Sequence, residues 1–309
     1  MMIVPLDLHP DVRAALAEHR PVVALESTLI THGLPYPTNL QTALAMEKAI
    51  RDRGATPATV AILDGRIRVG LELGDIERLI ELGPEQVRKC SRRDLPLVVG
   101  LKGHGATTVA GTMIVAHMAR IDVFATGGIG GVHRGHPQDI SADLIELGRT
   151  PVTVICSGAK SILDLPLTLE VLETQGVPVI GYGTDELPAF YSRSSGLPVD
   201  LRIESPAEAA AIIDARAMLG LPQGILITVP VPAEHELPAG EAEQAIAEAT
   251  RIADEQGITG KAITPFVLGK VLELTGGRSR DANTALLINN AAVAAQVAVA
   301  LAELRFSRR

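Results

Sequence analysis

The stretch PVTVICSGAK (residues 151–160) is the most informative part of this chain. Its β-branched first half predicts a buried strand over residues 152–157, and the run ends in small residues and Lys160. Open α/β sheets bind ligands in the loops that follow their strands. Burial there favours an uncharged amine, which is a nucleophile toward carbonyl carbon. The alternative is an ordinary surface lysine, because most lysines are exposed.

Strand-like and helix-like segments alternate on both sides of this run. Strands are predicted over 21–25, 122–126, 178–181 and 224–228, with a hairpin of 58–63 and 66–70 that turns at Asp64-Gly65. Helices are predicted over 38–53, 75–82, 106–119, 161–175, 206–219, 240–256, 263–275 and 280–304. This alternation predicts an α/β fold with a mostly parallel, mixed sheet covered by helices on both faces, in a single domain over residues 1–309.

The composition argues against nucleic acid as a partner. Of the 309 residues only 2% are aromatic, and the formal net charge is -8. Binding to a phosphate backbone needs a basic surface, and base stacking needs aromatic side chains. The two cysteines, Cys90 and Cys156, are too few for a disulfide framework, and the N-terminal residues do not resemble a secretory signal. We therefore expect a cytoplasmic protein.

Residues 285–303 are apolar and helix-forming, yet they do not predict a membrane span. Asn289, Asn290 and Gln296 interrupt the segment, and their amides would be costly in hydrocarbon. A helix buried in the fold, or covered by another subunit, is the better interpretation. We expect no membrane association.

The loop ALESTLITHGLPYPTNLQTA (24–43) places Glu26 directly after an apolar strand. A carboxyl group in apolar surroundings can have a raised pKa and act as a general acid. The alternative is an acid that caps a helix or a turn.

Two neighbouring segments, 89–96 and 102–113, predict a phosphate site. Glycines and the hydroxyls of Thr107 and Thr108 precede an apolar helix, so free backbone N–H groups of the 105–109 turn could hold a phosphate beside Lys89. Glycine-rich turns before helices are common, and the basic residues there could equally form a solvated face.

The next two loops carry glycines, histidines and acids. The stretch ATGGIGGVHRG (125–135) follows a strand but is not a dinucleotide fingerprint, and His133 could be a ligand or an acid–base group. In QDISADLIEL (138–147), Asp139 and Asp143 are spaced i, i+4 and are expected to share a helix face with Ser141 between them. Such oxygen ligands suit Mg²⁺ or Mn²⁺. The alternative is an N-cap aspartate and an exposed first-turn acid.

Taken together, the motifs resemble one family. ALESTLITHGLPYP, GATTVAGTM, ATGGIGGVHRG, DISADL, VICSGAKSILDLPLTLE, GYGTDELPAFYSRSSG and ANTALLINNAAVAAQVA occur in this order from about residue 20 to about residue 300. They are similar to the pseudouridine-5′-phosphate glycosidase family, also called the indigoidine synthase A family. The resemblance implies a three-layer α/β/α fold that assembles as a homotrimer.

The resemblance also implies an activity and a set of site residues. The activity is reversible cleavage of the C–C glycosidic bond of pseudouridine 5′-phosphate into uracil and ribose 5-phosphate, with a divalent metal, typically Mn²⁺, although Mg²⁺ is possible. By motif position Lys160 is the nucleophile, Glu26 the proton donor and Asp139 the metal ligand. His133 and Asn283 match catalytic positions, and the substrate positions are Lys89, Thr108, Val109, Ser141 and Asp143.

A C–C bond has no heteroatom in its leaving group to protonate, so the two-carboxylate hydrolysis of O-glycosides does not transfer. An imine between Lys160 and the ring-opened sugar would supply an electron sink. Two other hypotheses are a sugar-phosphate lyase that uses the same lysine and a binding protein without activity. A pseudouridine kinase is the expected pathway partner.

Overall fold

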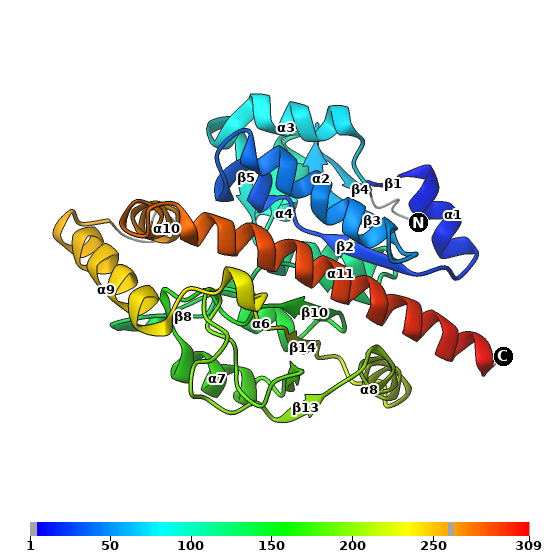
Figure 1. Ribbon diagram of the computed structural model, residues 1–309. Coiled ribbons are helices and arrows are strands. Elements are labelled where there is room, and N and C mark those ends of the chain that lie inside the picture. Colours follow the sequence, from blue (N-terminus) through cyan, green and yellow to red (C-terminus); the bar gives the residue numbers. More distant parts are fainter. Residues whose placement is uncertain (1–4, 259–262, 309) are drawn as a thin grey trace.

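A mixed sheet runs through the centre of the molecule (Figure 1), and the structure, a computed structural model, describes residues 5–258 and 263–308. In spatial order its main path is β1 (Leu6–Leu8), β4 (Arg66–Val69), β3 (Thr56–Leu63), β2 (Val22–Leu25), β7 (Val123–Ala125), β10 (Thr153–Cys156), β14 (Ile225–Thr228), β12 (Val179–Tyr182) and β13 (Leu201–Ile203). From β3 to β13 every neighbouring pair on this path is parallel. Antiparallel pairing of β3 with β4 makes the sheet mixed.

Two short strands extend the sheet beside β3. They are β5 (Val87–Cys90) and β6 (His104–Thr107), which are parallel to each other, and β6 is antiparallel to β3. A separate three-stranded antiparallel sheet lies outside the main sheet and consists of β8 (Val132–His133), β9 (His136–Ile140) and β11 (Leu163–Asp164).

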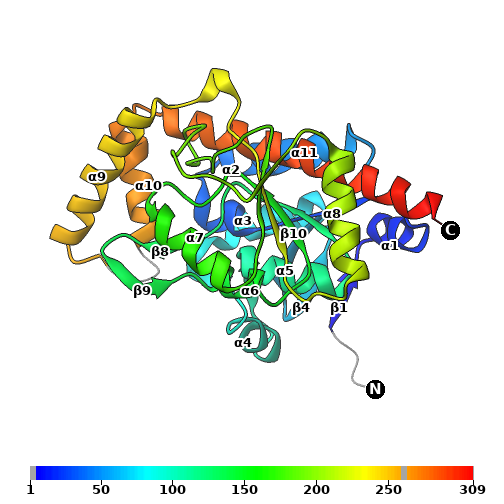
Figure 2. The same cartoon turned by 90° about the horizontal axis from the view of Figure 1, so that it is seen from below.

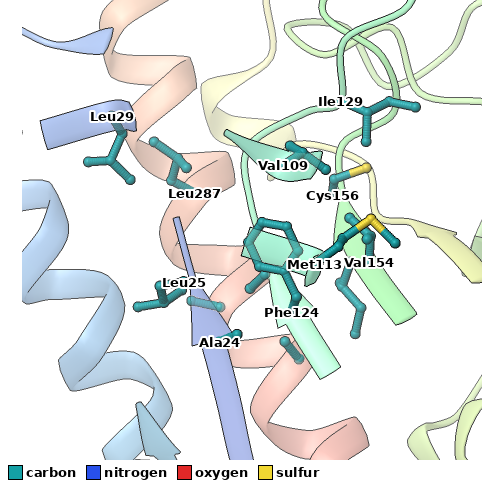
Figure 3. Close-up of a cluster of buried hydrophobic side chains, with 14 of the residues drawn as sticks. Ala24, Leu25, Leu29, Val109, Met113, Phe124, Ile129, Val154, Cys156 and Leu287 are labelled. Carbon is teal, nitrogen blue, oxygen red and sulfur yellow. The ribbon is translucent and has the colours of Figure 1, made fainter. Parts of the chain in front are cut away.

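Helices cover the sheet on both sides (Figure 2). They are α1 (Pro10–Ala17), α2 (Thr38–Arg51), α3 (Leu73–Gln86), α4 (Leu95–Gly100), α5 (Val109–Met118), α6 (Ala142–Leu147), α7 (Leu165–Thr174), α8 (Pro206–Met218), α9 (Ala239–Glu255), α10 (Ile263–Leu274) and α11 (Arg278–Ser307). In the core, Phe124 of β7 lies among side chains of β2, β10 and α5, with Leu287 of α11 nearby (Figure 3). The predicted α/β fold class with a mostly parallel, mixed sheet is confirmed.

The longest helix, α11, crosses the molecule between α2 and α8 and packs on β2, β7 and β10 (Figure 1). By length and composition it is the one described helix that could cross a membrane, and 56% of its apolar window is buried inside the protein. It is therefore a core helix, as its polar interruptions predicted.

Two local predictions fared differently. The hairpin at Asp64-Gly65 is confirmed, because β3 and β4 pair antiparallel and both turn residues have the positive φ, 53° and 73°, that a type I′ turn needs. The predicted helices over 106–119 and 161–175 begin too early. Residues 104–107 form β6 before the helix starts at Val109, and α7 starts at Leu165 behind the N-cap Asp164.

Candidate active site

Glu26 lies at the carboxyl end of β2, next to the end of its parallel neighbour β7. Its Oε1 accepts a hydrogen bond from the hydroxyl of Thr126, the first residue after β7. The residue is only 9% exposed. Parallel pairing of β2 with β7 therefore brings together two polar side chains that lie 100 positions apart in the sequence.

The environment of Glu26 favours its protonated form. Burial raises the pKa of the carboxyl group above its ordinary value, and the nearby charge of Asp143 adds to this effect. The positive charges of Lys160 and Lys89 and the hydrogen bond from Thr126 oppose it, but the net direction is upward. A carboxyl group that keeps its proton at higher pH can act as a general acid, as the sequence predicted.

Lys160 is half-buried and follows β10 through a tight turn. Its backbone N–H donates to the carbonyl of Ile129 at 3.1 Å. Within the turn Gly158 has φ +82°, and a Cβ added there would lie 2.2 Å from the carbonyl oxygen of Pro188. Only glycine fits this position, so the turn that presents Lys160 has a defined shape.

Two cavities meet at this point. One has a volume of about 590 Å³ and the other of about 190 Å³, and Glu26, Thr28, Lys89 and Lys160 line both. Every residue that the sequence placed at the site lines at least one of them. Thr108, Val109, His133, Asp139, Ser141 and Asp143 line the larger cavity, and Asn283 lines the smaller.

The larger cavity has a basic side. Lys89 lies at the end of β5 rather than in a loop, and Arg92, Arg93 and Arg149 line the same cavity. These side chains can attract a phosphate dianion. Arg92 is itself bound to Glu146 by two hydrogen bonds of 2.8 and 2.6 Å, so its charge is partly compensated.

The expected phosphate cradle of free amides at residues 105–109 is largely wrong. The N–H of Thr107 donates to Ser27 Oγ and that of Thr108 to the carbonyl of Cys90, because this segment is strand β6 and its end. Within α5, the N–H of Ala110 donates to Asp143 Oδ1 at 2.9 Å, and that of Gly111 to the Thr108 hydroxyl. The N–H of Val109, at the start of α5, has no hydrogen-bond partner among the residues that the structure describes.

The carboxylate of Asp143 links two segments of the site through hydrogen bonds. Its Oδ1 accepts from Ala110, and its Oδ2 accepts from the N–H of Gly130 at 2.9 Å. A Cβ on Gly130 would lie 2.2 Å from Ser141 Oγ, so this glycine allows the close approach. The glycine-rich loop after β7 and the start of α5 are thus tied together by one carboxylate that is 6% exposed.

The expected i, i+4 pairing of Asp139 with Asp143 on one helix face is wrong. Asp139 is exposed in strand β9, Ser141 is the N-cap of α6, and Asp143 lies in the first turn of that helix. The capping hydroxyl starts the helix only after Asp139, so the two carboxylates serve different elements. The alternative of an N-cap aspartate and an exposed first-turn acid is right only in placing an acid in the first turn, because Ser141 is the cap and Asp143 is buried.

A metal ion at Asp139, as the sequence predicts, would have few protein ligands. Among the described residues, no group of three or more His, Cys, Asp or Glu side chains is placed to hold an ion. Asp139 lines the larger cavity and is exposed, and its carboxylate suits an ion that keeps most of its waters, such as Mg²⁺ or Mn²⁺. Burial lowers the pKa of nearby His133, with Asp139 opposing this and His136 and Lys89 adding to it.

Among the residues of the smaller cavity that sequence reasoning did not assign to the site are Thr126 and His32. Thr126 is the last residue of the strand predicted over 122–126, and this position at a strand end was the available signal. The Nε2 atom of His32 lies 3.0 Å from the carbonyl oxygen of Val87. Burial lowers the pKa of His32, and the charge of Lys89 adds to the effect.

A family model described as indigoidine synthase A like protein matches residues 11–300 of this chain. The chain belongs to this family. Curated relatives in the family are named pseudouridine-5′-phosphate glycosidase. The one from Paracoccus denitrificans is 56% identical over 297 residues, covering 96% of this chain and 98% of the relative. The one from Geobacillus kaustophilus is 59% identical over 290 residues, covering 93% and 96%.

Two similar solved structures have the same fold. The prealnumycin C-glycosynthase AlnA in complex with ribulose 5-phosphate is 42% identical, with a TM-score of 0.90 over 98% of this chain and 99% of that one. An indigoidine synthase A-like protein from Thermotoga maritima is 35% identical, with a TM-score of 0.88 over 97% of both chains. The family resemblance seen in the motifs is thereby confirmed.

Proposed function

We propose that this chain cleaves the C–C glycosidic bond of pseudouridine 5′-phosphate, reversibly, to give uracil and ribose 5-phosphate. The observation that carries the proposal is that Glu26, whose pKa burial raises, lines the same cavities as Lys160. Relatives 56% and 59% identical bear the corresponding name. An acid beside an amine is the pair that ring opening of a sugar by imine formation requires.

Binding places the sugar between these two groups. Lys89 and Val109 line the larger cavity, where the amine of Lys89 and the N–H of Val109 would hold the 5′-phosphate, with Arg93 and Arg149 adding positive charge. Binding energy from the phosphate then holds the anomeric carbon near the amine, where a small displacement would cost rate.

Chemistry begins when Lys160, as the free amine, attacks the anomeric carbon while Glu26 gives its proton to the ring oxygen. The C–O bond of the ring breaks with its electrons going to the ring oxygen, which leaves an open-chain sugar whose first carbon carries both the base and the nitrogen of Lys160. After this nitrogen has given a proton to the Glu26 carboxylate, the bond to the base breaks: the base carbon keeps the bonding electrons and takes up a proton, and the nitrogen lone pair forms an iminium with the sugar carbon. Hydrolysis of the imine by water releases ribose 5-phosphate and restores the amine.

Asp139 would hold a hydrated Mn²⁺ or Mg²⁺ on the rim of the larger cavity. When bound, such an ion supplies positive charge that stabilises negative charge developing on the uracil carbonyl oxygens. His133 lines the same cavity and, with its lowered pKa, is a neutral group that could move a proton at the base.

A second candidate is a reaction on another carbon nucleophile. AlnA, 42% identical to this chain, is named a C-glycosynthase and was solved with ribulose 5-phosphate. The same lysine and acid could join a sugar phosphate to a different acceptor, or act as a sugar-phosphate lyase.

Uracil release distinguishes the candidates. The purified chain is incubated with pseudouridine 5′-phosphate and Mn²⁺, with and without chelator, and uracil is measured by chromatography. We expect release that falls with chelator. No uracil from the wild-type chain under any metal condition would overturn the proposal. Homotrimer assembly, a cytoplasmic location and a pseudouridine kinase as pathway partner stay predictions from the family resemblance.

A further inference from the structure

Asn290 is a fully buried amide in the middle of the apolar helix α11. Its Nδ2 donates to the carbonyl oxygen of Thr126 at 2.9 Å and to Ser157 Oγ at 3.1 Å. Burying an amide is costly unless its hydrogen bonds are made, so its presence here calls for a reason beyond packing.

The two groups that Asn290 contacts belong to the ends of neighbouring parallel strands, β7 and β10. Thr126 follows β7, and its hydroxyl donates a hydrogen bond to Oε1 of Glu26. Ser157 follows β10 and begins the turn that presents Lys160, and its N–H donates to the carbonyl of Gly127 at 2.8 Å. The side chain of Asn290 thus connects Thr126, which contacts the proposed acid, with Ser157, which begins the turn that carries the proposed nucleophile.

We propose that Thr126, held in place by Asn290, is a positioning residue for Glu26. It fixes the Oε1 atom of Glu26 by a hydrogen bond and leaves Oε2 to carry the proton delivered to the sugar. The inference rests on the proposed function, in which Glu26 is the acid.

The geometry leaves Thr126 little freedom. It is 1% exposed, its N–H donates to the carbonyl of Ile155 at 3.0 Å, and its own carbonyl accepts from Asn290. With the backbone fixed at both groups, the hydroxyl has a defined place beside the carboxyl group. Oε2 of Glu26 has no hydrogen-bond partner among the residues that the structure describes.

The bond from Thr126 also influences the proton on Glu26. A donor to the carboxyl group favours its ionised form and therefore opposes the upward effect of burial on the pKa. The other charged groups that act on Glu26 are Lys160 and Lys89, which lower its pKa, and Asp143, which raises it. Removing the hydroxyl of Thr126 leaves these three in place.

The experiment compares Thr126→Val, which keeps the shape and loses the donor, with Thr126→Ser, which keeps the donor. Uracil release is measured across pH. We expect Thr126→Val to lower kcat about tenfold, as for one lost positioning hydrogen bond, and to move the alkaline limb of the profile to higher pH. Thr126→Ser should restore both the rate and the limb.

A second pair tests the anchor. Asn290→Leu leaves the carbonyl of Thr126 without its donor, and Asn289→Leu is the matched control on the same helix. The side chain of Asn289 is half-buried and has no hydrogen bond to any described residue. We expect kcat to fall in Asn290→Leu and to stay at the wild-type level in Asn289→Leu. If Asn290→Leu does not fold, the Thr126 pair decides alone.

The outcomes separate the two proposals. A wild-type chain that releases no uracil overturns the proposed function and this inference with it. An active wild type whose pH profile and kcat are unchanged in Thr126→Val overturns the inference alone. A rate loss that Thr126→Ser shares equally would also overturn it, because a hydroxyl donor would then not be what matters.

Discussion

Glu26 and Asp139 are both carboxylic acids of one site, yet the protein places them in opposite surroundings. Glu26 is 9% exposed at the end of a strand in the main sheet, whereas Asp139 is exposed on a strand of the small antiparallel sheet. Burial raises the pKa of Glu26. If Glu26 is the acid and Asp139 the metal ligand, as proposed, the comparison teaches that proton transfer is assigned to a buried carboxyl group and metal binding to a solvent-exposed one.

The difference follows from the fold. The parallel strands β2, β7 and β10 end at the same edge of the sheet, and α11 packs on all three. Side chains that follow these strands are therefore covered by α11 and by the neighbouring strand ends. Strand β9 pairs on one side with β8 and lies outside the main sheet, so its side chains meet water.

The largest loss of activity is expected in the buried part of the site, around Glu26 and Lys160. Lys160→Met removes the amine and keeps a side chain of similar length, and we expect uracil release to fall by at least about a thousandfold, as when a covalent nucleophile is lost. Thermal unfolding should stay near that of the wild type, because Lys160 is half-buried and carries no side-chain hydrogen bond to a described residue. Substantial remaining turnover would remove Lys160 from the mechanism.

The next effect concerns the acid. Glu26→Gln can still accept the hydrogen bond from Thr126 but has no proton to give, and we expect kcat to fall by about 10² to 10⁴. Binding of ribose 5-phosphate, measured by calorimetry, should change little. Loss of binding together with rate would show that Glu26 holds the sugar rather than protonating it.

Much of the buried part of the site could be predicted from the sequence, because apolar runs locate the ends of strands and parallel strands end at the same edge of a sheet. Glu26 and Lys160 were found in this way. The exposed part around Asp139 could not be predicted. Its i, i+4 spacing from Asp143 suggested one helix for both residues, but spacing does not show that the helix begins only after the cap, Ser141. Asp143 also bonds two backbone N–H groups from distant segments, a contact that spacing alone does not predict.

A smaller loss of activity is expected at the exposed residue Asp139. Asp139→Asn weakens the one carboxylate proposed for the metal, and we expect activity at limiting Mn²⁺ to fall by about 10- to 100-fold, with partial recovery in excess metal. Stability should change by less than about 0.5 kcal/mol, as for most exposed positions. An unaltered dependence on Mn²⁺ would place the metal elsewhere.

The smallest effect is a pH dependence of stability at Glu26. Because its folded pKa is raised above the ordinary value of 4.5, the stability that its proton gives is complete below that value and is lost as the pH rises through the folded pKa. Glutamine has no such loss, so Glu26→Gln should gain stability relative to the wild type as pH rises. Unfolding temperatures of the two proteins would be compared across pH, and parallel curves would contradict the buried acid.

The most direct measurement of the central claim is borohydride trapping with ribose 5-phosphate, read by peptide mass spectrometry. Two lysines, Lys89 and Lys160, line both cavities, so the position of the label is informative. The account predicts a reduced sugar adduct on Lys160, absent from Lys160→Met. An adduct on Lys89 alone, or none while uracil is still released, would contradict it.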